Sequence, residues 1–292
     1  MISSSSKTIH VMGYDWPLNS ATGMLMAKDK AATAAILCAM KIPVVPHTLV
    51  LSPMEWSQYL KKDRGTMTDL MNTLKTYGSL VLKPKQGTSG NDLFKVDNQI
   101  QLECAWYRLL SSNQDFVWSP YVPIVTEYRT VVLNGKIRLC YAKVRPSVVG
   151  DGSSTLGQLI PKSLYSVLST TDNASSLDMN RIPKDGESVL LEWQHNLCRG
   201  ARASAEDVPD DLAPKLHAMA LQTMRAMNLC FASVDIVEVR RENSSSAVPD
   251  LRVLEVNAGV MMEFYMQQHP EDEKRCKAIY EDALKLAMAR AE

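Results

Sequence analysis

The alternation of apolar and polar positions is clearest near the C-terminus, in Phe231–Val239 and Leu251–Asn257. Both runs have a period of two, which predicts two half-buried strands joined by the long polar stretch between them. Side chains two residues apart lie on one face of a strand, so Glu255 and Asn257 point the same way, and Asp235 can join them from the partner strand. Two carboxylates and an amide predict a site for Mg²⁺.

The alternative is that these acidic residues lie on a solvated strand face. Glu255, however, stands inside the core-like run Val253–Val256. Burying a carboxylate without a partner is costly, so the pattern favours the metal site over the surface.

The same periodicity, read along the chain, predicts the remaining elements. Helices are expected at about 30–40, 52–55 onward, 63–77, 101–111, 156–168, 207–227 and 271–291, and strands at 8–12, 79–84 and 189–193. Two β-rich runs joined by Asn134-Gly135 predict a hairpin over 127–143. Helices that alternate with antiparallel hairpins predict an α+β fold rather than a doubly wound parallel sheet.

Composition narrows the functional classes. The 292 residues carry no net charge, with 46% apolar and 22% charged residues, which argues against a general nucleic-acid binder. The six cysteines and five histidines are scattered, without the spacing of a zinc site or a disulfide framework. The polar start Met1–Lys7 lacks a signal core, and no apolar run approaches the ~20 residues of a membrane span. We therefore expect a cytoplasmic protein that binds neither nucleic acid nor membrane.

A phosphate-binding loop is the second candidate feature. Lys83 ends an apolar strand, and the loop Lys85–Asn91 that follows is rich in Gly, Thr and Ser. Backbone N–H groups of such a loop can surround phosphates while Lys83 supplies a positive charge, although a plain turn is the alternative. The Gly-Lys-Ser/Thr of a P-loop is absent. Lys30 begins a predicted helix, where the helix dipole disfavours a cation, which hints at a role outside the helix.

Several short motifs, in this order, resemble the ATP-grasp superfamily. They are Asp29-Lys30, Val81-Leu-Lys83-Pro with its small-residue loop, Glu127-Tyr-Arg129, Asp235 and Glu255-Val-Asn257-Ala. The segment Val148–Leu156 is similar to one in cyanophycin synthetase, and Asn196–Gly200 is similar to one in the ligases that add glutamate to a ribosomal protein. The ATP-grasp domain of bifunctional glutathione synthetase belongs to the same branch.

The resemblance implies an ATP-grasp fold in which two α+β subdomains with antiparallel sheets clasp a nucleotide. Residues 28–292 would form this domain after a short segment, 1–27, with the small nucleotide-covering subdomain at about 46–122. The N-terminal domain that usually precedes is largely absent, so part of the acceptor site would either be missing or come from the second subunit of a homodimer.

The resemblance also implies roles for individual residues. Those that would bind ATP are Lys30, Lys83, Gln86, Gly87, Thr88, Ser89, Gly90, Tyr121, Val122 and Glu127. One or two Mg²⁺ ions, or Mn²⁺, would be held by Asp235, Glu255 and Asn257. Arg199 and Lys83 would stabilise the transferred phosphoryl group, and the substrates would meet Arg129, Arg145, Asn196 and Gly259.

The implied activity is an ADP-forming carboxylate–amine ligase that makes amide or peptide bonds on amino acids or small peptides through an acyl phosphate. Two alternatives remain open at this point. One is a small-molecule kinase on the same scaffold, and the other is a non-catalytic nucleotide-binding module.

Overall fold

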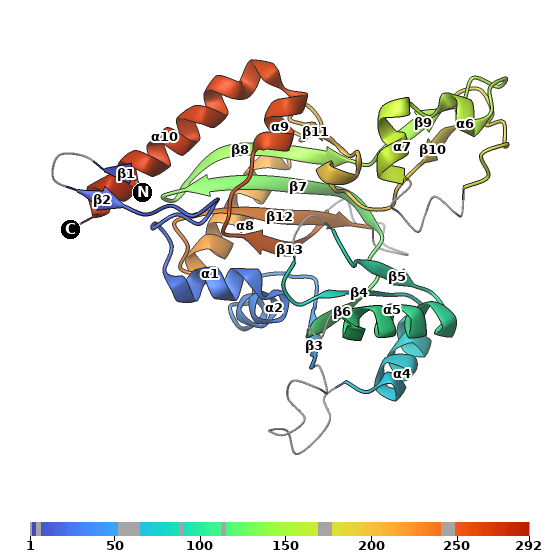
Figure 1. Cartoon of the computed structure of the whole chain (residues 1–292), viewed down its shortest axis with the longest axis horizontal. Coiled ribbons are helices and arrows are strands. Elements are labelled where there is room, and N and C mark those ends of the chain that lie inside the picture. Colours follow the sequence, from blue (N-terminus) through green and yellow to red (C-terminus); the bar gives the residue numbers. More distant parts are fainter. Residues whose placement is uncertain are drawn as a thin grey trace.

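Two antiparallel sheets form the frame of the protein (Figure 1). The structure is a computed structural model, and it describes residues 2–3, 7–51, 65–87, 90–111, 115–168, 177–240 and 249–291. The larger sheet has the strand order β11-β8-β7-β12-β13, and the smaller sheet has the order β3-β6-β4-β5. The expected α+β class with antiparallel pairing is therefore confirmed.

The larger sheet is built from two long hairpins and a short edge strand. Its strands are β7 (Ile124–Leu133), β8 (Lys136–Val144), β11 (Arg202–Ser204), β12 (Phe231–Val239) and β13 (Asp250–Asn257). The β7–β8 turn is the predicted Asn134-Gly135, and both residues have positive φ, at 49° and 70°. Such a turn matches the twist of a hairpin, which explains why this pairing could be predicted.

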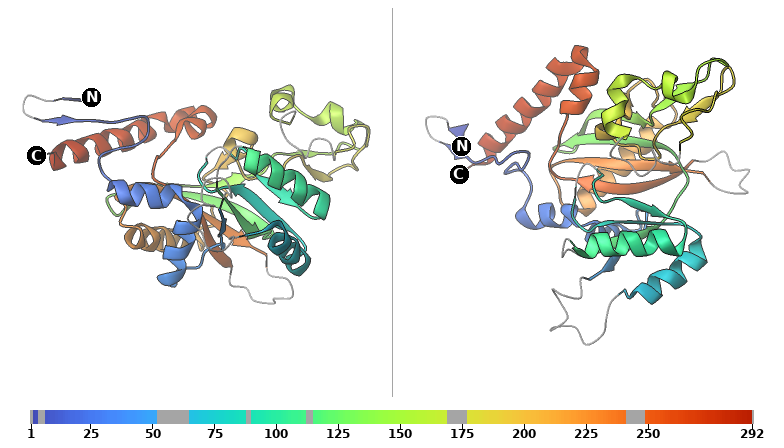
Figure 2. Two further views of the ribbon diagram at one scale, coloured as in Figure 1. Left: turned by 60° about the horizontal axis from the view of Figure 1, so that its bottom comes forward. Right: turned by 45° about the vertical axis from the view of Figure 1, so that its right-hand side comes forward.

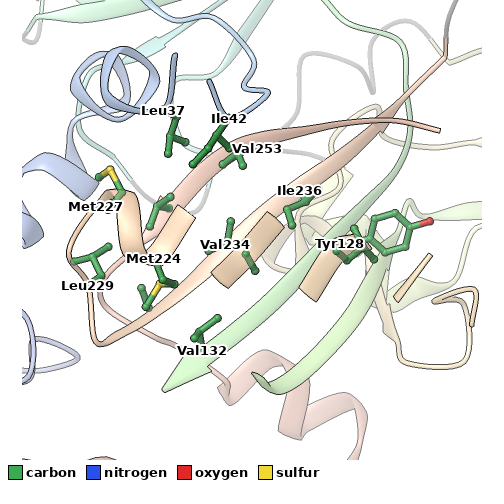
Figure 3. Close-up of a cluster of buried hydrophobic side chains, with 14 of the residues drawn as sticks. Leu37, Ile42, Tyr128, Val132, Met224, Met227, Leu229, Val234, Ile236 and Val253 are labelled. Carbon is green, nitrogen blue, oxygen red and sulfur yellow. The ribbon is translucent and has the colours of Figure 1, made fainter. Parts of the chain in front are cut away.

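Helices α1 (Ala21–Lys28), α2 (Lys30–Ala39) and α8 (Ala213–Ala226) cover one face of the larger sheet. Their apolar side chains meet those of β7, β12 and β13 in one buried cluster, which includes Leu37, Met224, Val234 and Val253 (Figure 3). Asp29 caps α2 by accepting bonds from the backbone N–H groups of residues 31 and 32, as the sequence predicted. Because successive strand residues alternate, Asp235 lies on the opposite face from its neighbours in this cluster.

Helix α10 (Glu273–Arg290) packs on the other face, together with α9 (Glu263–Gln268) and the N-terminal strand β2 (Thr8–Ile9), which pairs with β1 (Ile2–Ser3). The side chains that α10 buries are Cys276, Ile279, Ala283 and Ala287, at helical spacing. A 3-10 turn, η3 (Pro270–Asp272), joins α9 to α10.

Side chains from the end of α9 cap the free edge of β11. The amide of Gln268 donates to Ala201 O (3.1 Å) and accepts from Ala203 N (2.8 Å), and His269 Nε2 lies 2.7 Å from Ala203 O. At the opposite edge of the sheet, Val253 of β13 exchanges backbone bonds with residues 43 and 45. Both borders of the larger sheet therefore have hydrogen-bond partners.

The smaller sheet lies beside the larger one and carries its own helical layer (Figure 2). Its strands are β3 (Thr48–Val50), β4 (Leu80–Pro84), β5 (Phe94–Val96) and β6 (Phe116–Pro120). Helices α4 (Met67–Tyr77) and α5 (Gln99–Ser111) bury Leu70, Leu74, Leu102 and Leu109 against it. A capping box between Thr66 and Asp69 begins α4, later than the predicted start at 63.

A small outlying unit spans β9 (Ser147–Val149), α6 (Leu156–Leu159), α7 (Lys162–Leu168) and β10 (Ser188–Leu190), with its own apolar cluster. The prediction of one helix over 156–168 is wrong because Pro161, which has no backbone N–H, separates two short helices. Helix α1 was not predicted, although Ser20 is its N-cap. The helix expected from residue 52 lies outside the described residues.

None of the helices in the described part of the chain is long and apolar enough to cross a membrane.

The central cluster predicts a large effect for truncation of Leu216, which is fully buried on α8. Leu216→Ala should lower the free energy of unfolding by about 3 kcal/mol through lost burial and a residual cavity. Leu190→Ala, at a position that is 45% exposed, is the matched control and should cost much less. Urea denaturation of both variants measures the difference, and equal losses would contradict the packing described here.

Candidate active site

A cavity lies between the two sheets, and both contribute to its walls. The smaller sheet provides Lys83 on β4 and residues 119–122 at and just beyond the end of β6, whereas the larger sheet provides residues of β7, β8, β12 and β13. Most of the side chains singled out in the sequence border this space. Asp235, Arg199 and Gln86 do not line the cavity, and Thr88 and Ser89 lie outside the described residues.

The three side chains of the predicted metal site meet as the strand pattern predicted. Asp235 on β12 is directly opposite Glu255 on β13, and Asn257 Nδ2 lies 3.3 Å from Asp235 Oδ2 and 3.2 Å from Glu255 Oε1. A β-bulge follows the Asp235–Glu255 pair, because Ile236 pairs with Val253 and leaves Leu254 as the extra residue. The bulge directs Leu254 to the cavity wall beside Glu255.

Asp235 is fully buried and bound by two cations. Arg129 on β7 holds it with a two-pronged contact of 2.8 and 2.7 Å, and Lys143 Nζ on β8 lies 3.0 Å from Oδ2. Burial alone would raise the pKa of Asp235, but Arg129 and Lys143 outweigh it and hold the pKa below its usual value. Because the Arg129 guanidinium is bound to Asp235, Arg145 is the arginine of the predicted pair that is left to meet a substrate.

Lys143 was missed from the sequence, although it links two of the predicted residues. Its ammonium contacts both Asp235 and the carboxylate of Glu127, which stands opposite it across the β7–β8 pair. Burial raises the pKa of Glu127 to about 7, and the Lys143 ammonium opposes that rise. The alternation of apolar and polar residues along β8 could have indicated Lys143. Its partner on β7 could not be found by counting residues from the turn, because a β-bulge lies between them.

The two predicted phosphate-binding lysines line the cavity together. Lys83 is buried, which lowers its pKa to about 8, and the nearby carboxylate of Glu255 opposes this effect while Lys30 adds to it. Lys30 donates from Nζ to Gly87 O (3.2 Å), and its backbone N–H donates to Lys85 O (3.2 Å). Helix α2 is thereby joined to the loop after β4.

The loop that follows β4 touches the far wall of the cavity at Gly90. Arg199, in the 3-10 turn η2 (Leu197–Arg199), donates from Nη2 to Gly90 O (3.0 Å). A Cβ added at Gly90 would stand 2.6 Å from Gln194 Oε1 and 2.7 Å from Asn196 Nδ2, and φ at Gly90 is +69°. Only glycine permits this close approach. Gln194, which was not predicted, is therefore a contact point between the loop and the larger subdomain.

The segment after β6 borders the opposite end of the cavity. The Tyr121 N–H donates to Ser79 O (3.0 Å), and the Val122 carbonyl accepts from Ile124 N (2.9 Å). The Tyr121 ring meets the indole of Trp193 edge-on at 6.1 Å between ring centres. Because Trp193 comes from the segment after β10, this aromatic pair joins two walls of the cavity.

Arg145 follows β8 and lines the cavity next to His195. Among the described residues, no acidic side chain forms an ion pair with Arg145. Burial, together with the positive charges of Arg145 and Lys143, lowers the pKa of His195 to about 3, so the imidazole is neutral. Arg145 therefore brings an unpaired positive charge to this wall, as an anion-binding residue would.

Gly259 also borders the cavity, just beyond Asn257, where the N-terminal turn Met12–Asp15 packs against it. A Cβ at Gly259 would lie 3.3 Å from the Cβ of Tyr14. The predicted substrate residues Asn196 and Gly259 thus lie on the walls of the same cavity.

The donor set fits a hard divalent cation in its chemistry, because it offers carboxylate and amide oxygens. Among the described residues no cluster of three or more His, Cys, Asp or Glu side chains could hold a metal, so Asn257 would have to complete the set. Glu255 and Asn257 line the cavity directly and offer oxygen ligands. Asp235 would reach a metal by exchanging one of its contacts with Arg129 or Lys143.

The chain is similar in sequence to cyanophycin synthetases and to bifunctional proteins of glutathione biosynthesis. It is 23% identical to cyanophycin synthetase of Trichormus variabilis over 240 residues, 74% of this chain and 24% of that protein. It is 27% identical to the glutathione biosynthesis bifunctional protein GshAB of Streptococcus agalactiae over 179 residues, 54% of this chain and 24% of that protein. The chain thus spans about a quarter of the length of these relatives. No protein-family model matches it.

Solved structures show the same fold. The D-alanine–D-alanine ligase of Bacillus anthracis superposes with a TM-score of 0.57 at 15% identity, covering 92% of this chain and 71% of that one. D-alanyl-alanine synthetase A of Vibrio cholerae gives a TM-score of 0.57 at 13% identity, covering 93% and 68%. Together with the sequence matches, these likenesses confirm the resemblance that the motifs indicated: the chain is similar to the ATP-grasp ligases and has their fold.

Proposed function

We propose that the protein is an ATP-dependent, ADP-forming ligase that joins a carboxylate to an amine, with amino acids or small peptides as substrates. The observation that carries the proposal is the convergence of Lys30 and Lys83 with the Asp235–Glu255–Asn257 cluster on one cavity between two sheets. Phosphoryl transfer needs positioning and charge neutralisation, and this arrangement offers both.

In the first step, a substrate carboxylate oxygen would attack the γ-phosphorus of ATP, the bond to the β-phosphate oxygen would break, and ADP would leave. Lys30, Lys83 and Arg199 would neutralise the phosphate charge that accumulates. Glu255 and Asn257, with Asp235, would hold one or two Mg²⁺ or Mn²⁺ ions, and the metal would supply electrostatic stabilisation of the phosphates. Glu127 would receive the ribose, and Tyr121 and Val122 the adenine.

In the second step, an amine would attack the acyl carbon, phosphate would leave, and the amine proton would pass to phosphate or solvent. Arg145 suits a substrate carboxylate because its guanidinium has no acidic partner among the described residues. Asn196 and Gly259 border the same space.

The direct test combines the purified protein with Mg²⁺-ATP and a mixture of the twenty L-amino acids. Phosphate release and a new amide mass are the expected products. Glu255→Gln should reduce turnover by at least about a hundredfold, because a carboxylate of the charge-stabilising cluster is lost. Full turnover in this variant, or a phosphorylated product in place of an amide, would overturn the proposal.

The loop contact at Gly90 leads to a prediction about nucleotide binding. Gly90→Ala should weaken Mg²⁺-ATP binding about tenfold, because the methyl group meets Gln194 and Asn196 and the backbone is strained at positive φ. Gly87→Ala is the matched variant, since its Cβ would meet nothing closer than 3.6 Å and should cost less. Calorimetric titration of both variants measures the ratio, and equal losses would show that closure at Gly90 is unimportant.

The low pKa of Lys83 predicts a dependence on pH. Its ammonium is charged below about pH 8 and loses its proton above that value, so the attraction for phosphates declines as the pH rises through this range. Wild-type affinity for Mg²⁺-ATP should therefore fall several-fold between about pH 7 and about pH 9.5. Lys83→Arg keeps its charge at high pH and should show a flatter profile. Parallel profiles would exclude Lys83 as the titrating group.

A further inference from the structure

A second apolar region of the cavity lies beyond the predicted metal site. Along β13 and the segment that follows it, Leu254 precedes Glu255 and Asn257, and Met261 comes after them; all four line the cavity. Leu254 packs on the same small apolar cluster as Val122, which would receive the adenine. Met261 lies past the metal ligands, at an end of the cavity to which the proposed reaction gives no role.

Four cavity-lining side chains from two neighbouring segments form this region, which we call the apolar wall. They come from the turn η2 and from the start of α9: Leu197, Cys198, Met261 and Phe264. The two segments are in contact, and Leu197 packs on the buried cluster that includes Val260, next to Met261. Met261 is 37% exposed and the other three are partly exposed, so all four have surface left for a ligand.

The charged residues that adjoin this wall in the sequence do not line the cavity. Arg199 follows the η2 half of the wall, and its guanidinium donates to Gly90 O in the loop after β4. Glu263 stands within the α9 half, and its carboxylate lies 3.5 Å from the Tyr280 hydroxyl. A ligand on the wall would therefore meet apolar side chains and not these two charges.

Backbone polar groups near the wall are also occupied by the fold. The Cys198 N–H donates to Asn196 Oδ1 (2.9 Å), and the Leu197 carbonyl accepts from the N–H of the residue that ends η2 (3.3 Å). The Met262 N–H donates to the Tyr280 hydroxyl (3.1 Å). A polar group of a ligand would lose water here without gaining these partners, which is unfavourable, whereas an apolar group gains from burial.

We propose that the apolar wall binds the side chain of an amino acid substrate, so that one of the two joined molecules carries a large aliphatic or aromatic side chain, such as that of leucine, methionine or phenylalanine. This inference rests on the ligase function proposed above and names the class of one substrate. Because the wall is apolar, each further methylene that the substrate buries on it should improve binding by up to about fourfold.

The first experiment measures the substrate preference of the wild-type protein. Each of the twenty L-amino acids is supplied with Mg²⁺-ATP, alone and in pairs, and phosphate release and product mass are recorded. The amides that form should contain a large apolar residue, and replacing that amino acid by alanine should lower kcat/KM at least about tenfold. Amides made solely from charged, polar or small amino acids would overturn the inference.

Two variants connect the preference to the wall. Met261→Ala and Phe264→Ala should each raise the KM of the apolar substrate about tenfold and change the KM of ATP less than about twofold, because only the side-chain contact is lost. Met40→Ala is the matched control, since this methionine, just after α2, is 60% exposed and does not line the cavity. It should leave both KM values unchanged.

The thiol of Cys198 gives a readout that does not depend on turnover. Iodoacetamide labelling with peptide mapping compares Cys198 with the exposed Cys38 and Cys104 in the same sample. With a non-hydrolysable ATP analogue present, the apolar substrate should slow alkylation of Cys198 several-fold and leave the other two rates unchanged. Alkylation of Cys198 at the same rate with and without saturating substrate would show that the ligand binds elsewhere.

The possible outcomes separate the two proposals. Amides without a large apolar residue, a KM that is unchanged in both wall variants, or an unprotected Cys198 each overturn the inference and leave the ligase function standing. Absence of phosphate release and of amide with every pair of amino acids would overturn the ligase function itself, and the inference with it.

Discussion

The ion cluster around Asp235 is the constraint on which the rest of the site depends. A fully buried carboxylate on β12 is bound by Arg129 from β7 and Lys143 from β8, and Lys143 also binds Glu127. These contacts cross three adjacent strands at the floor of the cavity. Removing one partner would leave an uncompensated buried charge. The stability lost in that way is far larger than the net stabilisation that the intact ion pair provides. The cluster therefore fixes the relative positions of the side chains that face the nucleotide and the substrates.

The β-bulge in the β7–β8 hairpin decides which residue of β8 enters this cluster. Counting outward from the Asn134-Gly135 turn pairs Glu127 with Ala142, whereas the bulge at Arg138 shifts the register so that Glu127 faces Lys143. A shift of one residue moves every later side chain to the other face of the strand. Period-two alternation identified the strands, and the turn identified the hairpin. Neither carries a local signal for the extra residue, so Lys143 could not be placed from the sequence.

The meeting of Asp235, Glu255 and Asn257 could be predicted because it depends only on adjacent strands and alternation. Gln194 could not, because its contact with Gly90 joins segments about a hundred residues apart and belongs to no periodic element. Helix α9 was missed because six residues are too few for a clear period. The sequence thus predicted the strand-borne part of the site, and packing between distant segments determined the remainder.

The capping of β11 by Gln268 and His269 has a consequence for self-association. An open strand edge presents unpaired N–H and C=O groups on which another chain can add a strand, and proteins commonly block such edges. Here the side chains from the end of α9 cover one border of the larger sheet, and residues 43–45 cover the other. Two copies of this protein cannot merge their larger sheets edge to edge at these positions without first displacing those groups.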